Sequence, residues 1–329
     1  MRRKTRLRAR VGGPGDRVGE QTSRGQEVRE SVSIQGRVDA GREEHVEEDR
    51  HERSGPHEDL LVQPTGSPRF HHRSGRLAHQ GGQALLVRYR GRARLSQDID
   101  LQCTHPERSA EEARDLVVKA AALDLGDYLR YVPGKFEEHS DEGRGGAQYF
   151  EVFLGAGLVS TIKVDLVVGR ELIGVPEVRT LRSAVDLAWP VDWPDVRLYP
   201  VIDHIADKVC AMYERHGQNG EHGSNRYRDL ADLLLISQRE AVDGPAVCRA
   251  LQQEAARRSS LGLRIVLPGA FEVPGPDWHD GYPRQAALVH GLEGCSSFSE
   301  AVPAAEAFLS PILGDAARGT WIPHQRAWA

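Results

Sequence analysis

The segment Leu95–Leu101 alternates acidic and apolar residues: Asp98 and Asp100 are interleaved with Ile99 and Leu101. Successive side chains of a strand point to opposite faces of a sheet, so this pattern predicts a strand with one acidic face and one buried face. Two carboxylates on one such face repel each other unless a cation neutralises them. The segment therefore favours a sheet with a site for a divalent cation, Mg²⁺ or Mn²⁺.

A second candidate strand, Ile162–Val168, carries a third carboxylate. Its apolar residues occupy every second position, which places Lys163 and Asp165 on the opposite face. If the two strands are neighbours, Asp165 joins Asp98 and Asp100 around one or two metal ions, as in two-metal phosphoryl chemistry. An Asp-x-Asp sequence alone often only caps a turn, so the pattern also fits a purely structural role.

The first 60 residues differ in composition from the rest. They contain few apolar residues and no aromatic residue, although acidic and basic residues are frequent. Such a segment buries too little apolar surface to offset its chain entropy. We expect residues 1–75 to be a disordered tail, or upstream sequence translated from a wrong start codon.

The whole-chain properties exclude several classes of protein. With 329 residues and a formal charge of −5, the chain is long enough for a real core and lacks the basic field of a histone-like nucleic-acid binder. No apolar run approaches the roughly 18 residues that span a membrane. The 4 cysteines form no Cys-x-x-Cys pair, so a reducing cytoplasm is the expected location.

Two helices are indicated around the expected sheet. Gly81 and Gly82 precede a helical segment that ends near Tyr89. Further on, Pro200 suits a first helical turn, and an apolar stripe follows at helical spacing, formed by Ile202, Ile205, Val209 and Met212. Lys208 borders this stripe, so we expect it to reach a site without entering the core. The alternative is a solvated lysine, and in either case its truncation is expected to leave the fold intact.

A third helical segment carries Asp229 and Asp232 on one face, with Leu230, Leu233 and Leu234 on the apolar side. The Gly- and Asn-rich segment before it, His216–Asn225, is expected to be a mobile loop.

These motifs together resemble the AbiEii/AbiGii toxin family of nucleotidyltransferases, within the polymerase-β-like superfamily. The resemblance rests on Gly-Gly-x-Ala-Leu at position 81, on Arg-Leu-Ser-x-Asp-Ile-Asp-Leu at 94–101, and on the Lys-bearing segment Tyr199–Met212 with the Arg-Asp-x-x-Asp segment that follows it. A looser similarity extends through Ala301–Leu313 to Trp328, so the resemblance covers about residues 81–329.

The resemblance implies roles for individual residues. Asp98 and Asp100 would bind metal, and Asp165 would be a third ligand and the base for the attacking hydroxyl. Gly81, Gly82 and Ser96 would bind the nucleotide. The triphosphate would be held by Lys208, and Asp229 would assist catalysis or orient that lysine.

Two departures from the family pattern are visible. Gln83 stands where the family usually has Thr or Ser, so a hydroxyl contact to phosphate is expected to be missing. The segment Phe70–Gln80 is polar and basic where the family has an apolar strand, which predicts that the first strand is damaged or absent.

Other features have simpler interpretations. Arg88, Arg90, Arg92 and Arg94 fit phosphate contacts and a solvated connector equally well. The 14 histidines show no metal-ligand spacing. Trp278, Trp321 and Trp328 lie near prolines and are expected to be packing anchors rather than base-stacking platforms.

The sequence thus predicts an α+β protein: a small mixed-sheet nucleotidyltransferase domain over residues 76–195 and a helical domain over 196–329. The implied function is transfer of a nucleotide from an NTP to an acceptor, RNA such as the tRNA acceptor end, by the toxin of a toxin–antitoxin pair with a cognate antitoxin or regulator. The alternatives are a small-molecule nucleotidyltransferase of the antibiotic-modifying kind and a degenerate, non-catalytic binding protein.

Overall fold

The computed structural model describes residues 77–96, 98–105, 109–124, 128–139, 145–181 and 195–329. The predicted tail over residues 1–75 lies outside this part of the chain, so it stays a prediction. In the described part, no helix has the length and apolar character needed to cross a membrane.

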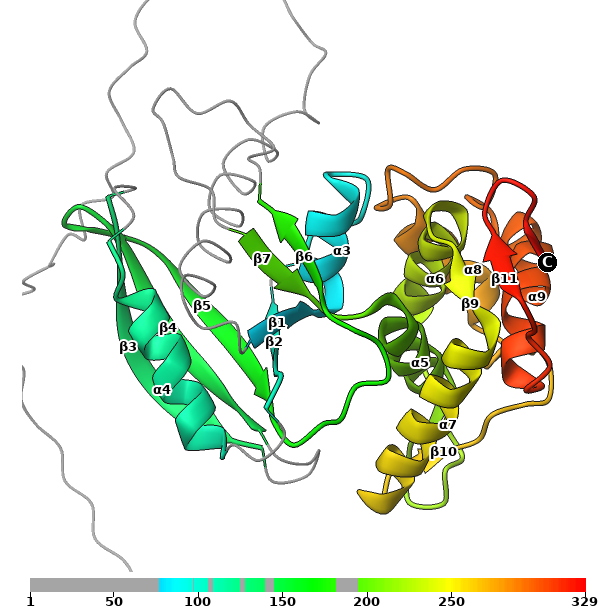
Figure 1. Cartoon of the computed structure of the whole chain (residues 1–329), viewed down its shortest axis with the longest axis horizontal. Helices are drawn as coiled ribbons and strands as arrows, with labels where there is room; N and C mark the ends of the chain where they lie inside the picture. Colours follow the sequence, from blue (N-terminus) through cyan, green and yellow to red (C-terminus); the bar gives the residue numbers. More distant parts are fainter. Residues whose placement is uncertain (1–76, 97, 106–108, 125–127, 140–144, 182–194) are drawn as a thin grey trace, which may run out of the picture. The chain divides into compact units, whose positions relative to one another are not determined.

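A mixed seven-stranded sheet forms in the first part of the described chain (Figure 1), in the order β3-β4-β5-β2-β1-β7-β6. The strands are β1 (Leu77–Gln80), β2 (Ile99–Cys103), β3 (Leu129–Glu138), β4 (Gly145–Leu154), β5 (Gly157–Val167), β6 (Glu177–Thr180) and β7 (Asp195–Leu198). Strand β2 is parallel to β5 and β1 is parallel to β7, whereas the other neighbours are antiparallel. The predicted mixed sheet is confirmed. The boundary at residue 195 stays a prediction.

The expectation that the first strand is damaged or absent is wrong. Residues Leu77–Gln80 form β1, which pairs with β2 and β7 near the middle of the sheet, and all four side chains are buried. Leu77 joins the apolar core, whereas His79 and Gln80 are polar residues buried by their neighbours. Pairing on both sides stabilises a strand that is too short and too polar to be recognised locally.

Two helices pack on the sheet. Helix α4 (Ala110–Ala121) begins with a capping box between Ser109 and Glu112. It lies over β3 and β4 in Figure 1 and contacts β3, β4 and β5, and its buried residues share a core cluster with Phe150, Val164 and Leu166. Helix α3 (Gly81–Tyr89) follows β1 directly and contacts β1 and β2.

The chain after the sheet is mainly helical, as predicted. It contains α5 (Val201–Met212), α6 (Tyr227–Arg239), α7 (Gly244–Ser260), α8 (Trp278–Ala286) and α9 (Phe298–Leu313). Helix α6 contacts α5, α8 and α9, and every residue from Asp229 to Ser237 is buried. A helix that is buried on all sides lies at the centre of its core.

Small antiparallel ribbons join these helices. One pairs β8 (Glu214–Arg215) with β10 (Arg264–Ile265), and the other pairs β11 (Thr320–Ile322) with β9 (Val242–Asp243) and β12 (Ala327–Trp328). Trp278 and Trp321 are buried, and their indole N–H groups donate to the carbonyl oxygens of Ser224 and Ser237 at 3.0 and 2.7 Å. Both residues are the packing anchors that the sequence predicts.

Candidate active site

A cavity of about 390 Å³ lies where the junction of β1 and α3, the start of β2 and the helices α5 and α6 meet. Seven of the predicted site residues line it together, from segments far apart in the sequence: Gly81, Gly82, Ser96, Asp98, Asp100, Lys208 and Asp229. Asp165 is not among the residues that line it.

The two glycines allow the start of α3 to lie against the acidic strand. Gly81 has a positive φ of 62°, and a Cβ atom there would lie 2.0 Å from Asp100 Oδ2. A Cβ atom on Gly82 would lie 2.7 Å from Ser96 Oγ. No side chain caps the first turn of α3. Its backbone N–H groups are therefore available to an anion beside the carboxylates.

Strand alternation places the carboxylates as predicted. Ile99 and Leu101 are buried, whereas Asp98 and Asp100 line the cavity. Asp100 is paired in register with Asp165 on the parallel neighbour β5. Burial and then the charges of Asp165 and Asp98 raise the pKa of Asp100 to about 6. Carboxylates that destabilise one another's charge fit a site for a cation.

Asp165 has two basic neighbours in the structure. Its carboxylate lies 2.8 Å from Lys163 Nζ and 3.4 Å from His139 Nε2. Among the described residues, no group of three His, Cys, Asp or Glu side chains is arranged to hold a metal ion. Asp98, Asp100 and Asp165 offer the oxygen ligands that Mg²⁺ prefers. The metal site itself stays a prediction.

Lys208 is buried, which corrects the expectation that it reaches the site without entering the core and excludes the alternative of a solvated lysine. Its side chain is 5% exposed, and its ammonium lies 2.9 Å from Asp229 Oδ1 and 2.6 Å from Asp232 Oδ2. Burial opposes the charged form, but these two carboxylates raise the pKa of Lys208. The lysine is thus a fixed cation that faces the cavity.

Two arginines complete this charge cluster. Arg226 Nε donates to Asp229 Oδ2 at 2.6 Å, and Arg94 Nη2 donates to Asp232 Oδ2 at 3.1 Å. Burial alone would raise the pKa of Asp229, but Lys208 and Arg226 hold it below its usual range. Three cations around two carboxylates leave one positive charge, which suits a phosphate group.

A comparison with protein families identifies the family of this chain. A family model described as the nucleotidyl transferase AbiEii toxin of type IV toxin–antitoxin systems matches residues 74–299. The chain belongs to the AbiEii nucleotidyltransferase toxin family. It is therefore a nucleotidyltransferase.

Similar solved structures are remote. The nucleotidyltransferase toxin MenT4 of Mycobacterium tuberculosis H37Rv is 16% identical over 79% of this chain and 90% of its own, with a TM-score of 0.40. JHP933 of Helicobacter pylori is 15% identical over 79% of this chain and 86% of its own, with a TM-score of 0.35. A comparison with curated protein sequences finds no significant match.

Gln83, the departure from the AbiEii pattern, has a structural role in this chain. Its side chain is buried, and its amide donates to the carbonyl oxygen of Ser96 at 2.7 Å. Gln83 thus fixes the backbone of a residue that lines the cavity. Where the family usually has a Thr or Ser hydroxyl, this chain has an amide whose hydrogen bond joins α3 to the segment that precedes β2.

The four alternating arginines separate into different roles, so neither sequence interpretation describes all of them. Arg88 is buried in α3, where it pairs with Glu177 and donates to the carbonyl oxygen of Tyr199 at 3.0 Å. Arg90 and Arg92 are exposed, and Arg94 lines the cavity.

Sequence reasoning missed a second charge cluster in the cavity wall. Asp207 on α5 lies 3.3 Å from Arg170 and 2.8 Å from Arg258, and Glu254 of α7 pairs with both arginines. Burial alone would raise the pKa of Asp207, but the two arginines hold it far below its usual range. The i, i+4 spacing of Glu254 and Arg258 was visible, but the partners on other elements were not.

Proposed function

We propose that this nucleotidyltransferase moves a nucleotide from an NTP to a hydroxyl group of RNA, such as the tRNA acceptor end. The reaction would require Mg²⁺ or Mn²⁺, and the chain would be the toxin half of a pair with a cognate antitoxin. The observation that carries the proposal is the meeting of an uncapped helix start, two carboxylates and a buried lysine in one cavity.

The cavity has separate places for the two charged parts of the reaction. The N–H groups of α3 at Gly81 and Gly82, together with Lys208, suit the oxygens of a triphosphate. Asp98 and Asp100 line the same cavity, Asp100 lies against this helix start, and both suit the metal ion that accompanies the nucleotide. When bound, that metal would supply charge neutralisation at the phosphates and activation of the attacking hydroxyl.

The residues of the chain would then orient substrate and move the proton. Asp229 and Asp232 hold the Lys208 ammonium in place and keep it protonated. The acceptor oxygen forms a bond to the α-phosphorus as the bond to pyrophosphate breaks, and we assign the released proton to the carboxylate of Asp165. The nearby Lys163 would stabilise the charge of that carboxylate.

Radiolabelled NTP incubated with total tRNA, with and without Mg²⁺, tests the proposal. Metal-dependent label on RNA supports it. Label that appears only on small molecules would favour an antibiotic-modifying enzyme, and absence of any label would favour a non-catalytic binding protein.

A further inference from the structure

Gln80 lies in the wall of the candidate active site, although no motif in the sequence points to it. It is the last residue of β1, and it is 7% exposed. It lines the cavity together with Asp98 and Asp100. An apolar side chain is the usual occupant of a buried strand position, so the polarity of Gln80 needs an explanation other than packing.

The register of the sheet places Gln80 beside Asp100. The two residues are directly opposite each other on the antiparallel strands β1 and β2. Side chains of such a pair lie on one face of the sheet, with their Cβ atoms about 4.5–5.5 Å apart. Asp100 Oδ2 lies against Gly81, the residue that follows Gln80, since a Cβ atom on Gly81 would be 2.0 Å from it. The amide of Gln80 and the carboxylate of Asp100 therefore belong to one corner of the cavity.

The side-chain oxygen of Gln80 is a buried acceptor without a donor. In the described part of the chain, Gln80 Oε1 accepts no hydrogen bond. Such an oxygen has given up its hydrogen bonds to water without replacing them, which costs free energy. Asp165 is opposite Asp100 on the other side, on β5, and its Oδ1 also accepts no hydrogen bond from the described residues. Gln80, Asp100 and Asp165 thus form one row of oxygen acceptors across three neighbouring strands.

A divalent cation is the partner that suits this row of oxygens. Mg²⁺ binds oxygen atoms and usually takes one or two carboxylates from a protein, with water and substrate phosphates as its other ligands. An amide oxygen is neutral, so it can join such a site without adding to the repulsion between Asp98 and Asp100. A hydroxyl or amino group of the NTP is the other kind of donor that Gln80 could accept from, but its pairing with Asp100 favours the cation.

We propose that the side-chain oxygen of Gln80 is a ligand of the divalent cation held by Asp98 and Asp100. The inference rests on the proposed function, because this cation is the one that would accompany the NTP. It gives a reason for a polar residue at a buried position of β1. It also adds to the site a ligand that lies outside the acidic motif of β2.

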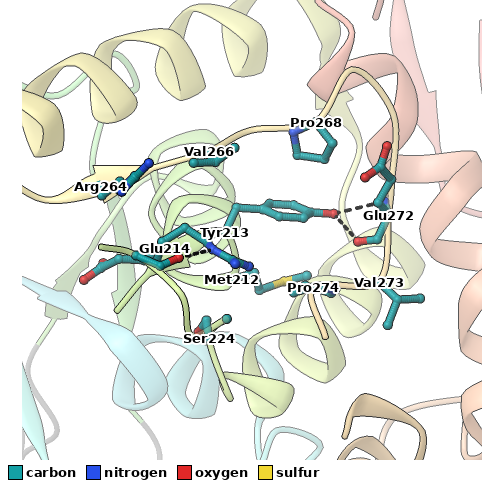
Figure 2. Close-up of a pocket in the computed structure, with 13 residues that line it drawn as sticks. Met212, Tyr213, Glu214, Ser224, Arg264, Val266, Pro268, Glu272, Val273 and Pro274 are labelled. Carbon is teal, nitrogen blue, oxygen red and sulfur yellow. Dashed lines mark hydrogen bonds between the residues drawn. The ribbon is translucent and has the colours of Figure 1, made fainter. Parts of the chain in front are cut away.

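A separate cavity provides a control carboxylate. This cavity, of about 450 Å³, lies around Tyr213. Its lining carboxylates are Glu214 and Glu272, and Figure 2 shows them on opposite sides of Tyr213. Carboxylates that are held apart in this way do not share an ion. Glu272→Gln therefore reports on Mn²⁺ that binds at isolated acidic groups rather than at the row on the sheet.

Binding of Mn²⁺ to the full chain tests the ligand without requiring catalysis. Electron paramagnetic resonance measures the free ion during titrations in the absence of nucleotide. Gln80→Met keeps the length of the side chain and removes its oxygen, and it should weaken Mn²⁺ binding by about 10- to 100-fold, as the loss of a partner at a metal site does. Gln80→Glu places a charged oxygen there and should tighten binding. Glu272→Gln should bind Mn²⁺ like the unmodified chain.

Thermal melts separate a metal ligand from a structural residue. Without metal, Gln80→Met should be at least as stable as the unmodified chain, because it removes a buried acceptor that has no donor. With Mn²⁺, the melting temperature of the unmodified chain should rise more than that of the variant, since a ligand stabilises the state that it binds.

Gln102→Met is the matched control. Gln102 lies two residues after Asp100 on the same face of β2 and is fully buried. Its side-chain oxygen also accepts no hydrogen bond from the described residues, but it does not line the cavity. The Gln102→Met variant should therefore keep the Mn²⁺ affinity of the unmodified chain.

The outcomes separate this ligand from the proposed function. Mg²⁺-dependent transfer of label to RNA, with equal Mn²⁺ affinities for Gln80→Met and the unmodified chain, would overturn the ligand and leave the function standing. A raised KM for NTP at constant Mn²⁺ affinity would place the nucleotide at Gln80 and would overturn the ligand as well. An unmodified chain that binds no Mn²⁺ would contradict both the ligand and metal-dependent transfer. The expected responses of the two Gln80 variants support the ligand even where no label reaches RNA.

Discussion

Substitution of Lys208 by Ala is expected to reduce both stability and activity. The ammonium contacts Asp229 and Asp232, whose side chains are 1% and 0% exposed. Removing one member of a buried ion pair costs about 3–5 kcal/mol, because it leaves buried charge uncompensated. The lower end applies here, since Arg226 still contacts Asp229 and Arg94 still contacts Asp232.

The expected loss of stability is small enough for Lys208→Ala to be studied as a folded protein. Native proteins have about 5–15 kcal/mol of stability, so a loss of about 3 kcal/mol leaves the Lys208→Ala variant mostly folded at room temperature. Its melting temperature should fall by roughly 6–12 °C at about 2–4 °C per kcal/mol. Activity measured on the folded variant should still fall by orders of magnitude, because the phosphate contact is lost.

Two comparisons separate stability from chemistry. Val209→Ala, one residue further along α5 and fully buried, should cost about 2 kcal/mol through lost packing and leave transfer nearly intact. A cycle of Lys208→Met with Asp232→Asn should show a coupling energy of about 1–3 kcal/mol, since the two groups are in contact. An unchanged melting temperature together with full activity in Lys208→Ala would refute the reasoning.

Three further predictions follow from the site and its surroundings. Gly81→Ala should lower the free energy of unfolding by at least about 1 kcal/mol and abolish transfer, because φ is +62° and the new Cβ atom would lie 2.0 Å from Asp100 Oδ2. Thermal melts and label-transfer assays check this prediction. A variant that is as active and as stable as the unmodified chain would contradict it. Gln83→Ala should remove the hydrogen bond that holds the Ser96 backbone, so the KM for NTP should rise while the melting temperature changes little. Steady-state kinetics and thermal melts measure the two effects. An unchanged KM would contradict this role of Gln83. Burial lowers the pKa of His79 to about 3 and that of His204 well below its ordinary value, so the unfolded chain binds more protons than the folded chain below about pH 6.5. Stability should therefore fall as the pH drops, and Asp100, whose pKa is raised to about 6, opposes part of this loss. Urea titrations between pH 7 and about pH 4.5 should show this loss, and His204→Gln should make the dependence of stability on pH shallower. Equal slopes for the variant and the unmodified chain would contradict the assignment.

Patterns that depend on neighbouring residues were predictable from the sequence. Alternation in β2 and β5 placed Ile99 and Leu101 in the core and Asp98 and Asp100 on the open face, as the structure confirms. The sequence could not show that β2 and β5 are neighbours. That pairing is a long-range choice, and it brings Asp165 beside Asp100.

Features that depend on long-range contacts were missed or misjudged. Strand β1 is polar at His79 and Gln80, so only its partners β2 and β7 identify it as a strand. Lys208 looks like a surface lysine in a helical pattern, and its burial follows from the acids of α6. The contact of Arg94 with Asp232 spans 138 residues, and no local pattern encodes such a pairing.

The position of the transferred label tests the central claim most directly. NTP labelled at the α-phosphate and NTP labelled at the γ-phosphate are each incubated with total tRNA, Mg²⁺ and either the unmodified chain or Asp100→Asn. We predict that only the α-label appears on RNA, that the unmodified chain transfers it, and that Asp100→Asn does not. Transfer of the γ-label, or equal α-label transfer by the Asp100→Asn variant, would contradict nucleotidyl transfer at this cavity.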